Sequence, residues 1–422
     1  MHEIKEADPE LYLELMKEVE RQRFVLNMIP SENYVSPTVL QASGSVLTNK
    51  YSEGYAGKRY YQGNEFIDNV ERIAIWRAKK LFGVEHVNVQ PYSGSPANQA
   101  VYLAVCNPGD IVMGHALPDG GHLTHGWKVN FSGMQYKAIQ YHVKKDGYID
   151  FDEVRTIARY CKPKLIWCGA TAYPREFPFE EFGKIADEVG AYFAADIAHI
   201  AGLIAAGVHK SPVPYAHIVT TTTHKTLRGP RGGMIMVTKK GLDKDSDLAK
   251  KIDKAVFPGL QGGPHEHVIA AKAVCFNEAM QLEFVEYARQ VVKNAKVLAE
   301  SLMAEGIKLV SDGTDTHLIL VNLLPLGVGL GKDVAVALEK AGIVCNANSI
   351  PEDPSTPFRP SGIRLGTPTL TTREMKEGEM RVIGKWISDV IKDRGNEELQ
   401  RSIHTRVREL CKGFPVYSGI EG

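Results

Sequence analysis

A lysine stands between a run of hydroxyl side chains and a glycine-rich turn. Lys225 follows four threonines and a histidine at residues 220–224, and Thr-Leu-Arg-Gly-Pro-Arg-Gly-Gly occupies residues 226–233. A lysine amine at the end of a predicted strand can form an imine with a carbonyl compound when desolvation or a nearby cation lowers its pKa. A single lysine is more often an exposed loop residue, but this context favours imine chemistry.

An aspartate ends an apolar run upstream of that lysine. Asp196 follows Ala-Tyr-Phe-Ala-Ala at residues 191–195, and His199 comes shortly after. A carboxylate at a buried strand end needs a cationic or hydrogen-bonding partner. A helix N-cap and a metal ligand are alternatives for this aspartate taken alone. Together with Lys225, however, Asp196 favours a pyridoxal-type cofactor, whose protonated ring nitrogen is such a partner.

Two glycine-containing turns are candidate anion sites. Ser93-Gly94-Ser95 lies between a predicted strand and a predicted helix, where backbone N–H groups and serine hydroxyls can bind a phosphate. The same tripeptide is also common in ordinary turns. The segment 259–264, Gly-Leu-Gln-Gly-Gly-Pro, is a second and equally ambiguous candidate.

His122 and His125 have H-x-x-H spacing within a glycine-flanked segment. A metal pair of this kind needs a third ligand in register. Stacking of a glycine-flanked imidazole on a flat ring is therefore the preferred hypothesis. We interpret His265 and His267 as structural or exposed.

Arg364 is the single arginine in an apolar strand predicted at residues 362–365. A buried guanidinium needs a carboxylate, and the planar fork of arginine matches one well. An amino-acid substrate could supply that carboxylate. A structural ion pair is the alternative.

Short apolar strands that alternate with helices must position these side chains. The pattern predicts strands at residues 86–90, 110–113, 135–142, 164–168, 191–195, 217–220 and 233–237, and helices at 68–82, 96–106, 151–161 and 179–189. This alternation is typical of an α/β domain with a mostly parallel sheet. Ligands bind such sheets at the carboxyl ends of the strands, where the candidate residues fall.

The ends of the chain predict further elements. Asp8-Pro9 begins a helix that is predicted to reach residue 28. Residues 29–63 show neither a helical nor a strand periodicity, and we interpret this long segment as functional. Residues 266–305 are predicted to be helical. A strand at 317–323, a helix at 332–340, the strand with Arg364 and a long helix from 371 indicate a second, α+β domain. The expected division is an N-terminal arm (1–30), a large domain (31–280) and a small domain (281–422).

Composition limits the class of protein. The 422 residues include 50 Lys+Arg and 50 Asp+Glu, so the net charge is zero and no excess of basic charge favours nucleic acid or an anionic membrane. No apolar run is long enough to span a bilayer, and the charged N-terminus lacks a signal core. Six scattered cysteines without a C-x-x-C pair indicate reduced thiols. We expect a cytoplasmic protein.

Several motifs, in this order along the chain, resemble those of the serine hydroxymethyltransferase family. They are Ser31-Glu32-Asn33, Asn-Lys-Tyr-Ser-Glu-Gly-Tyr at 49–55, Gly-Lys-Arg-Tyr-Tyr at 57–61, the Ser-Gly-Ser turn, Gly-Gly-His-Leu-Thr-His-Gly at 120–126, Asp-Ile-Ala-His at 196–199, and the segment 220–233. The resemblance extends over residues 8–392. The segment around Lys225 is the most specific of these motifs.

The resemblance implies a fold-type-I enzyme that uses pyridoxal 5'-phosphate (PLP), with a large domain built on a mostly parallel seven-stranded sheet. It implies interconversion of L-serine and tetrahydrofolate with glycine and 5,10-methylenetetrahydrofolate. It also implies a homodimer or a dimer of dimers, in which two chains share each active site.

The resemblance further implies a role for each matching residue. Lys225 holds the cofactor as a Schiff base, Asp196 contacts its ring nitrogen, His122 stacks on the ring, and His199, Thr171 and His224 lie near it. Ser93, Gly94 and Ser95 bind the phosphate, joined by Gly262 or Gly263 of the partner chain, and Tyr51 also enters from the partner chain. Ser31, Tyr61 and Arg364 hold the substrate carboxylate, and Glu53 is the acid/base residue. Glu53, Tyr60, Leu117, Gly121, Leu123 and Asn346 line the folate pocket.

The sequence also departs from the usual motifs, at Pro30, Tyr92, Pro96, Trp127-Lys128 and His265-Glu266. These departures affect fine substrate and pterin preference. A folate-independent aldolase for β-hydroxy amino acids is the nearest alternative function. A metal-dependent hydrolase that uses Asp196, His199, His122 and His224 is a second, but it leaves Lys225 and Arg364 without roles. An RNA-binding protein would need a basic patch.

Overall fold

The computed structural model describes residues 2–419 and divides the chain into two units. The larger unit is one continuous segment, Val35–Arg289. The smaller unit combines the N-terminal residues up to Tyr34 with the residues from Gln290 onward.

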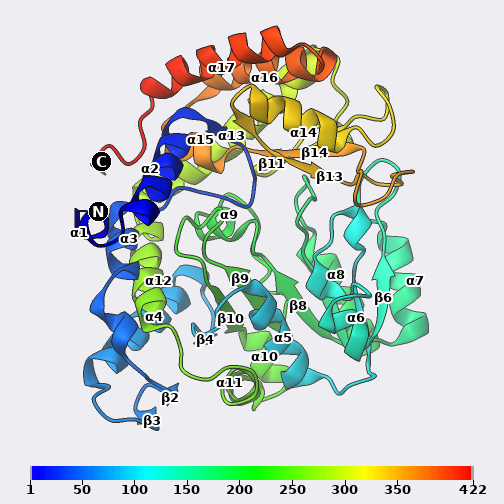
Figure 1. Cartoon of the computed structure of the whole chain (residues 1–422). Coiled ribbons are helices and arrows are strands. Elements are labelled where there is room, and N and C mark those ends of the chain that lie inside the picture. Colours follow the sequence, from blue (N-terminus) through cyan, green and yellow to red (C-terminus); the bar gives the residue numbers. More distant parts are fainter. Residues whose placement is uncertain (1, 420–422) are drawn as a thin grey trace. The chain divides into compact units, whose positions relative to one another are not determined.

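A seven-stranded sheet forms the centre of the larger unit (Figure 1). Its strands are β4 (His86–Asn88), β5 (Ile111–His115), β6 (Lys137–Tyr141), β7 (Leu165–Cys168), β8 (Tyr192–Asp196), β9 (Ile218–Thr222) and β10 (Gly233–Val237), in the order β4-β10-β9-β8-β7-β5-β6. β10 is antiparallel to both neighbours and the other pairs are parallel. The predicted α/β fold with a mostly parallel sheet is confirmed.

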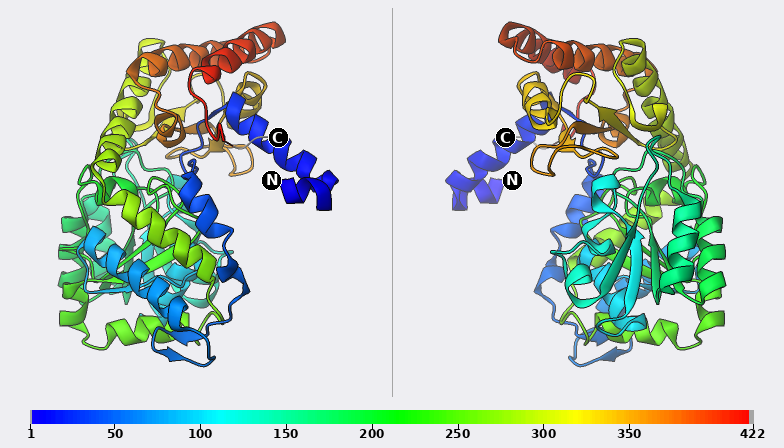
Figure 2. Two further views of the ribbon diagram at one scale, coloured as in Figure 1. Left: turned by 90° about the vertical axis from the view of Figure 1, so that its left-hand side faces the viewer. Right: turned by 90° about the vertical axis from the view of Figure 1, so that its right-hand side faces the viewer.

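Helices cover this sheet because a parallel sheet must bury both faces. They are α4 (Glu65–Phe82), α5 (Gly94–Val105), α6 (Phe131–Gln135), α7 (Phe151–Cys161), α8 (Phe179–Val189), α9 (Ala201–Ala205), α10 (Lys239–Lys244), α11 (Leu248–Val256) and α12 (Glu266–Ala279). α5 and α11 pack on the β9–β10 region, and α7 and α8 pack on β6, β7 and β8. α4 and α12 lie side by side (Figure 2, left).

The segment 29–63 is more regular than its sequence predicts. It contains α3 (Pro37–Ser43), a 3-10 turn (Val46–Asn49) and a small hairpin of β2 (Gly54–Tyr55) and β3 (Lys58–Arg59). The Ser36 hydroxyl accepts a hydrogen bond from the Val39 N–H at 3.1 Å, and Pro37 occupies the first helical position. Such capping starts a short helix where no hydrophobic period marks one.

The smaller unit is an α+β structure around an antiparallel three-stranded sheet. β14 (Gly362–Gly366) lies between β11 (Leu318–Asn322) and β13 (Asn346–Asn348). Its helices are α1 (His2–Ala7), α2 (Pro9–Phe24), α14 (Gly331–Lys340), α15 (Pro368–Thr372), α16 (Glu377–Lys392) and α17 (Glu397–Lys412). α13 (Leu282–Ala304) continues into this unit from the larger one.

Three predicted helices differ from the structure. The first ends at Phe24, because the next residues form β1 (Leu26–Asn27), which pairs in parallel with β12 (Ile343–Val344). The stretch 266–305 is two helices, α12 and α13. The long C-terminal helix is divided into α15, α16 and α17, and the Asn396 side chain caps the last of these at 2.9 Å from the Leu399 N–H.

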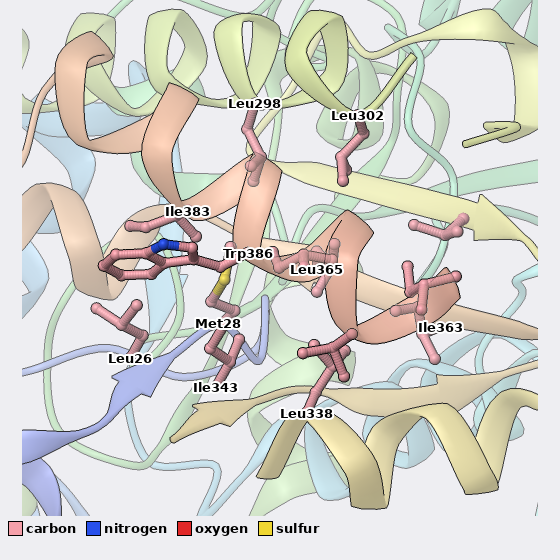
Figure 3. Close-up of a cluster of buried hydrophobic side chains, with 14 of the residues drawn as sticks. Leu26, Met28, Leu298, Leu302, Leu338, Ile343, Ile363, Leu365, Ile383 and Trp386 are labelled. Carbon is pink, nitrogen blue, oxygen red and sulfur yellow. The ribbon is translucent and has the colours of Figure 1, made fainter. Parts of the chain in front are cut away.

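The larger of two apolar clusters in the described part of the smaller unit, shown in Figure 3, stabilises this unit. It combines side chains from both ends of the chain, among them Leu26, Met28, Leu298, Leu338, Ile343, Ile363, Leu365, Ile383 and Trp386. Burial of such side chains contributes roughly 1.5–3 kcal/mol each. All six cysteines are free, as the sequence predicts. No helix in residues 2–419 is both long and apolar enough to cross a membrane.

Arg373 ties the two ends of the chain together within this unit. Its buried guanidinium donates hydrogen bonds of 2.7–3.3 Å to the backbone carbonyls of Gln22, Arg23, Val25, Cys411 and Phe414. Replacement by methionine removes this donor from all five carbonyls, of which those of Gln22 and Cys411 keep another donor, Tyr34 OH and the Phe414 N–H respectively. We therefore expect Arg373→Met to lower the local free energy of unfolding by at least about 3 kcal/mol.

Hydrogen exchange of the peptides that contain α2 and α17 measures this effect. Arg401→Met, which removes an exposed arginine from α17, is the matched control and should leave exchange almost unchanged. Equal protection in the two variants would contradict the role assigned to Arg373.

Candidate functional site

A pocket opens at the carboxyl ends of the central strands. It is lined by Gly94, His122, His125, Ala170, Thr171, Asp196, Ala198, His199, Thr222 and Lys225. Asp196 and Thr222 are the last residues of β8 and β9, and Gly94 is the first residue of α5. This position is the usual ligand site of an open α/β sheet. The strand ends thus bring together six residues that were predicted for the site and that come from five separate segments of the sequence.

Asp196 is held as a carboxylate by its neighbours. Its Oδ2 accepts a hydrogen bond from Asn98 Nδ2 at 2.8 Å and lies 3.1 Å from His125 Nε2, while Oδ1 accepts from the Ala198 N–H at 3.0 Å. Burial alone would raise the pKa of Asp196, but the His125 and Asn98 contacts hold this pKa well below its usual range. The pocket therefore presents a fixed negative charge.

Asn98 links the two sides of this carboxylate and was missed by the sequence analysis. Its amide nitrogen also donates to Thr124 Oγ1 at 2.8 Å, and its oxygen accepts from Thr220 Oγ1 at 2.7 Å. It lies one helical turn after Gly94 on α5, so both face the pocket side of the helix. Its position one helical turn after the Ser-Gly-Ser turn is the sequence feature that could have identified Asn98 as a pocket residue.

His122 has a defined orientation. Its Nδ1 accepts from the Thr124 N–H at 3.2 Å and lies 2.7 Å from Thr124 Oγ1. Burial lowers the pKa of His122 to about 4, so the ring is neutral at physiological pH. With Nδ1 acting as an acceptor, the ring proton is on Nε2. A flat, neutral imidazole thus lines the pocket.

The sequence does not predict a specific role for His125. Its ring stacks on Trp167, with centroids 5.2 Å apart and planes at 12°. This packing fixes the imidazole that contacts Asp196. The H-x-x-H spacing therefore gives two histidines with different functions.

The Lys225 amine enters the pocket directly after β9. Its Nζ donates a hydrogen bond to Thr222 Oγ1 at 3.0 Å. The following glycine-rich turn is closed by bonds from Thr223 Oγ1 to the Pro230 carbonyl at 2.6 Å and from the Gly229 N–H to the Thr223 carbonyl at 2.7 Å. The hydroxyl-rich run predicted from the sequence thus both contacts and supports the lysine.

The start of α5 is shaped for close approach of backbone groups. A Cβ at Gly94 would lie 2.8 Å from Thr222 Cγ2, and a Cβ at Gly233 would lie 2.3 Å from the Ser93 carbonyl oxygen. Ser93 is the N-cap residue and Ser95 lies in the first turn. Backbone N–H groups at such a helix start form an anion site.

The remaining residues predicted near the cofactor differ in position. Thr171 Oγ1 lies 3.2 Å from the carbonyl oxygens of both Gly120 and Gly121, and His199 is buried at the pocket wall. His224 is not among the residues that line the pocket. Burial lowers the pKa of His224 to about 3.

Comparison with known proteins decides the family. The family model described as serine hydroxymethyltransferase matches residues 4–387. A curated serine hydroxymethyltransferase of Acidothermus cellulolyticus is 58% identical over 417 residues, which cover 97% of this chain and 96% of the relative. The chain belongs to the serine hydroxymethyltransferase family.

Membership of this family establishes the cofactor and the reaction. Serine hydroxymethyltransferases use PLP, with tetrahydrofolate as cosubstrate. The protein is accordingly a PLP-dependent hydroxymethyltransferase that interconverts L-serine and tetrahydrofolate with glycine and 5,10-methylenetetrahydrofolate. Its substrates are small molecules, and the resemblance seen in the sequence is confirmed.

The metal-site alternative has a partial basis in the geometry. Ligand atoms of His122, His125 and Asp196 lie within 4.8 Å of one another. However, His125 and Asp196 are already bonded to each other, and Nδ1 of His122 accepts from Thr124. Serine hydroxymethyltransferases are PLP enzymes, so the hydrolase hypothesis is not retained.

A second cluster contains other residues predicted for the serine hydroxymethyltransferase site. Tyr51 OH donates to Glu53 Oε1 at 3.3 Å, and its ring meets Tyr61 edge-on with centroids 5.0 Å apart. A Cβ at Gly262 would lie 3.1 Å from Glu53 Oε1, and one at Gly263 would lie 3.4 Å from Tyr51 Cζ. None of these five residues lines the Lys225 pocket of the described chain.

The smaller unit holds further residues predicted for substrate and folate. Arg364 on β14 and Asn346 on β13 are paired across the sheet, and Arg364 Nε donates to Asn346 Oδ1 at 3.1 Å. Burial lowers the pKa of Arg364 to about 10. Ser31 lies in a turn after β1. The predicted arginine is thus held in a sheet by a neutral side chain.

Other predicted folate residues belong to the larger unit. Leu117 and Leu123 lie in short 3-10 turns after β5. A Cβ at Gly121 would lie 2.0 Å from the His115 carbonyl oxygen, so this position requires glycine. Tyr60 packs its ring against Phe257, with centroids 5.7 Å apart.

Proposed function

We propose that the Lys225 pocket is the PLP site through which the hydroxymethyltransferase reaction runs. The carrying observation is a largely buried carboxylate and a lysine amine in one pocket beside a helix start. The carboxylate suits the ring nitrogen of the cofactor, the lysine amine suits its aldehyde, and the helix start suits its phosphate. When bound, PLP accepts the electron pair released as the Cα–Cβ bond of serine breaks.

In this proposal each side chain has a defined task. Lys225 binds the cofactor aldehyde covalently, Asp196 keeps the ring nitrogen protonated, and His122 packs on the ring face. Ser93, Gly94 and Ser95 hold the phosphate through backbone N–H groups and hydroxyls. Thr171 and His199, which line the pocket, lie near the ring oxygen of the cofactor, and His224, next to Lys225, supports them from outside the lining.

Substrate and folate contacts complete the proposal. Arg364 binds the substrate carboxylate through its guanidinium fork, together with Ser31 and Tyr61. Glu53 moves the proton at the serine hydroxyl. Tyr60, Leu117, Gly121, Leu123 and Asn346 line the tetrahydrofolate pocket.

We also propose that the enzyme is a cytoplasmic homodimer with shared sites. Tyr51, Glu53, Gly262 and Gly263 form a cluster separate from the Lys225 pocket, which suits a contribution to the partner's pocket. The same region exposes large aromatic side chains, including Tyr60 at 71% and Phe66 at 74%. Exposed aromatic side chains of this kind are common at protein interfaces. The six free cysteines support a reducing compartment.

Complementation between two inactive variants tests the shared site. Lys225→Met and Glu53→Gln should each be inactive alone. A refolded mixture should regain about a quarter of wild-type activity, because half of the dimers then contain one intact site. A mixture as inactive as its components would mean that Lys225 and Glu53 of the same chain act together. Mixing Lys225→Met with Asp196→Asn, both in one pocket, is the control that should stay inactive.

A further inference from the structure

A lysine is buried in the larger unit without a direct carboxylate contact. Lys272 on α12 is 1% exposed, and its Nζ donates to the carbonyl oxygens of Val89 at 2.6 Å, Pro91 at 3.1 Å and Gly233 at 2.7 Å. An ammonium group has three donors, so these carbonyls use its whole capacity. A buried charge persists only with such partners.

These carbonyls belong to the backbone that leads into the anion site. Val89 and Pro91 follow β4, and Ser93 comes two residues later at the start of α5. Gly233 opens β10, its N–H donates to the Pro91 carbonyl at 3.1 Å, and it packs tightly on the Ser93 carbonyl. Lys272 thus joins the segment before Ser93 to the strand against which Ser93 packs.

The surroundings of Lys272 leave little freedom. A Cβ at Gly232 would lie 2.4 Å from Lys272 Cε and 3.1 Å from Nζ. Burial lowers the pKa of Lys272 to about 7, while the Glu266 and Glu71 carboxylates act in the opposite direction. The absence of a side chain at Gly232 leaves the space that the end of the Lys272 side chain occupies, so the two positions fit each other.

We propose that Lys272 is a positioning residue for the phosphate site. It fixes the backbone between Pro91 and Ser93, so that the Ser93–Ser95 turn presents its N–H groups and hydroxyls in one arrangement. This inference rests on the proposed assignment of that turn to the cofactor phosphate. It extends the assignment to a residue that lies outside the pocket lining.

Comparison of two ligands tests the role directly. The apoenzyme is titrated with PLP and with pyridoxal, which carries the same aldehyde and ring but no phosphate. Lys272→Met should raise the Kd for PLP by about tenfold or more. The hydrogen bonds that fix the backbone before Ser93 are lost, so the turn no longer holds its phosphate-binding groups in one arrangement. The Kd for pyridoxal should stay within about twofold, since pyridoxal makes no use of the anion site. The ³¹P resonance of bound PLP should also shift in the variant.

Two further variants separate positioning from general stability. Gly232→Ala displaces the lysine head without removing its charge, and should reproduce the selective loss of PLP affinity if Lys272→Met does not fold. Phe276→Leu, at another buried position of α12, should lower stability and leave the ratio of the two affinities unchanged.

Equal losses for PLP and pyridoxal in Lys272→Met and Gly232→Ala, or no loss, would overturn the positioning role. A wild-type apoenzyme that binds PLP no better than pyridoxal would instead overturn the assignment of the Ser93–Ser95 turn, and the inference with it. The two failures are distinguished by the wild-type titration alone.

Discussion

Lys225→Ala is expected to remove the visible absorbance band of the cofactor-bound enzyme and to lower turnover by at least about 10³-fold. Among the described residues that line the pocket, Lys225 is the one primary amine. Its Nζ is aimed by the Thr222 hydroxyl, and no neighbouring group can replace it in covalent binding of an aldehyde. Absorbance spectra before and after addition of PLP, with turnover of serine and tetrahydrofolate, measure both effects.

A surface variant provides the control for this experiment. Lys210→Ala removes an exposed lysine and should change neither the spectrum nor turnover. Glycine and tetrahydrofolate added together should shift the band of the wild type and of this control, whereas Lys225→Ala should have no visible band to shift. A wild-type spectrum in Lys225→Ala would show that another lysine binds the cofactor.

Asp196→Asn should separate cofactor binding from catalysis. The amide keeps the size of the carboxylate but not its charge, so the ring nitrogen loses the partner that keeps it protonated. We expect turnover to fall by about 10³-fold while the visible band remains, because Lys225 is unchanged. Asp187→Asn, on the outer helix α8, should leave both unchanged. Wild-type turnover in Asp196→Asn would exclude the proposed role.

The same carboxylate adds a pH-dependent contribution to stability. The pKa of Asp196 is lower in the folded protein than its ordinary value of 3.8. The stabilisation is therefore complete at neutral pH and is lost as the pH falls below that ordinary value towards the folded pKa. Asp196→Asn should accordingly flatten the acid limb of a thermal stability profile.

The sheet and the pocket were predictable because their signals are local. Seven apolar runs gave the strands, and a polar residue after an apolar run, such as Asp196, marks a strand end. The carboxyl ends of parallel strands meet at one edge, so the pocket followed from topology. The start of α17 has an equally local signal. Gly395 is a typical residue at a helix end and Asn396 a typical N-cap, although the predicted helix continued through both.

The residues that support the pocket were not predictable in this way. Asn98 and Lys272 are polar residues within helices α5 and α12, where a polar side chain is ordinarily solvated. Their partners are far away in sequence, namely Asp196 for Asn98 and the residues after β4 for Lys272. The end of α2 at Phe24 likewise depends on pairing with β12, which no local pattern encodes.

The division of the chain has a consequence for its synthesis. The larger unit is contiguous, so all its strands leave the ribosome together and can pair before translation ends. The smaller unit cannot fold this early, because its N-terminal part needs residues that are synthesised later. β1 pairs with β12, and the end of α2 is linked through Arg373 to the end of α17. The apolar side chains Leu26 and Met28 therefore remain without their core while most of the protein is made. Leu26 and Met28 can reach their native packing only after residues more than 300 positions later have been synthesised.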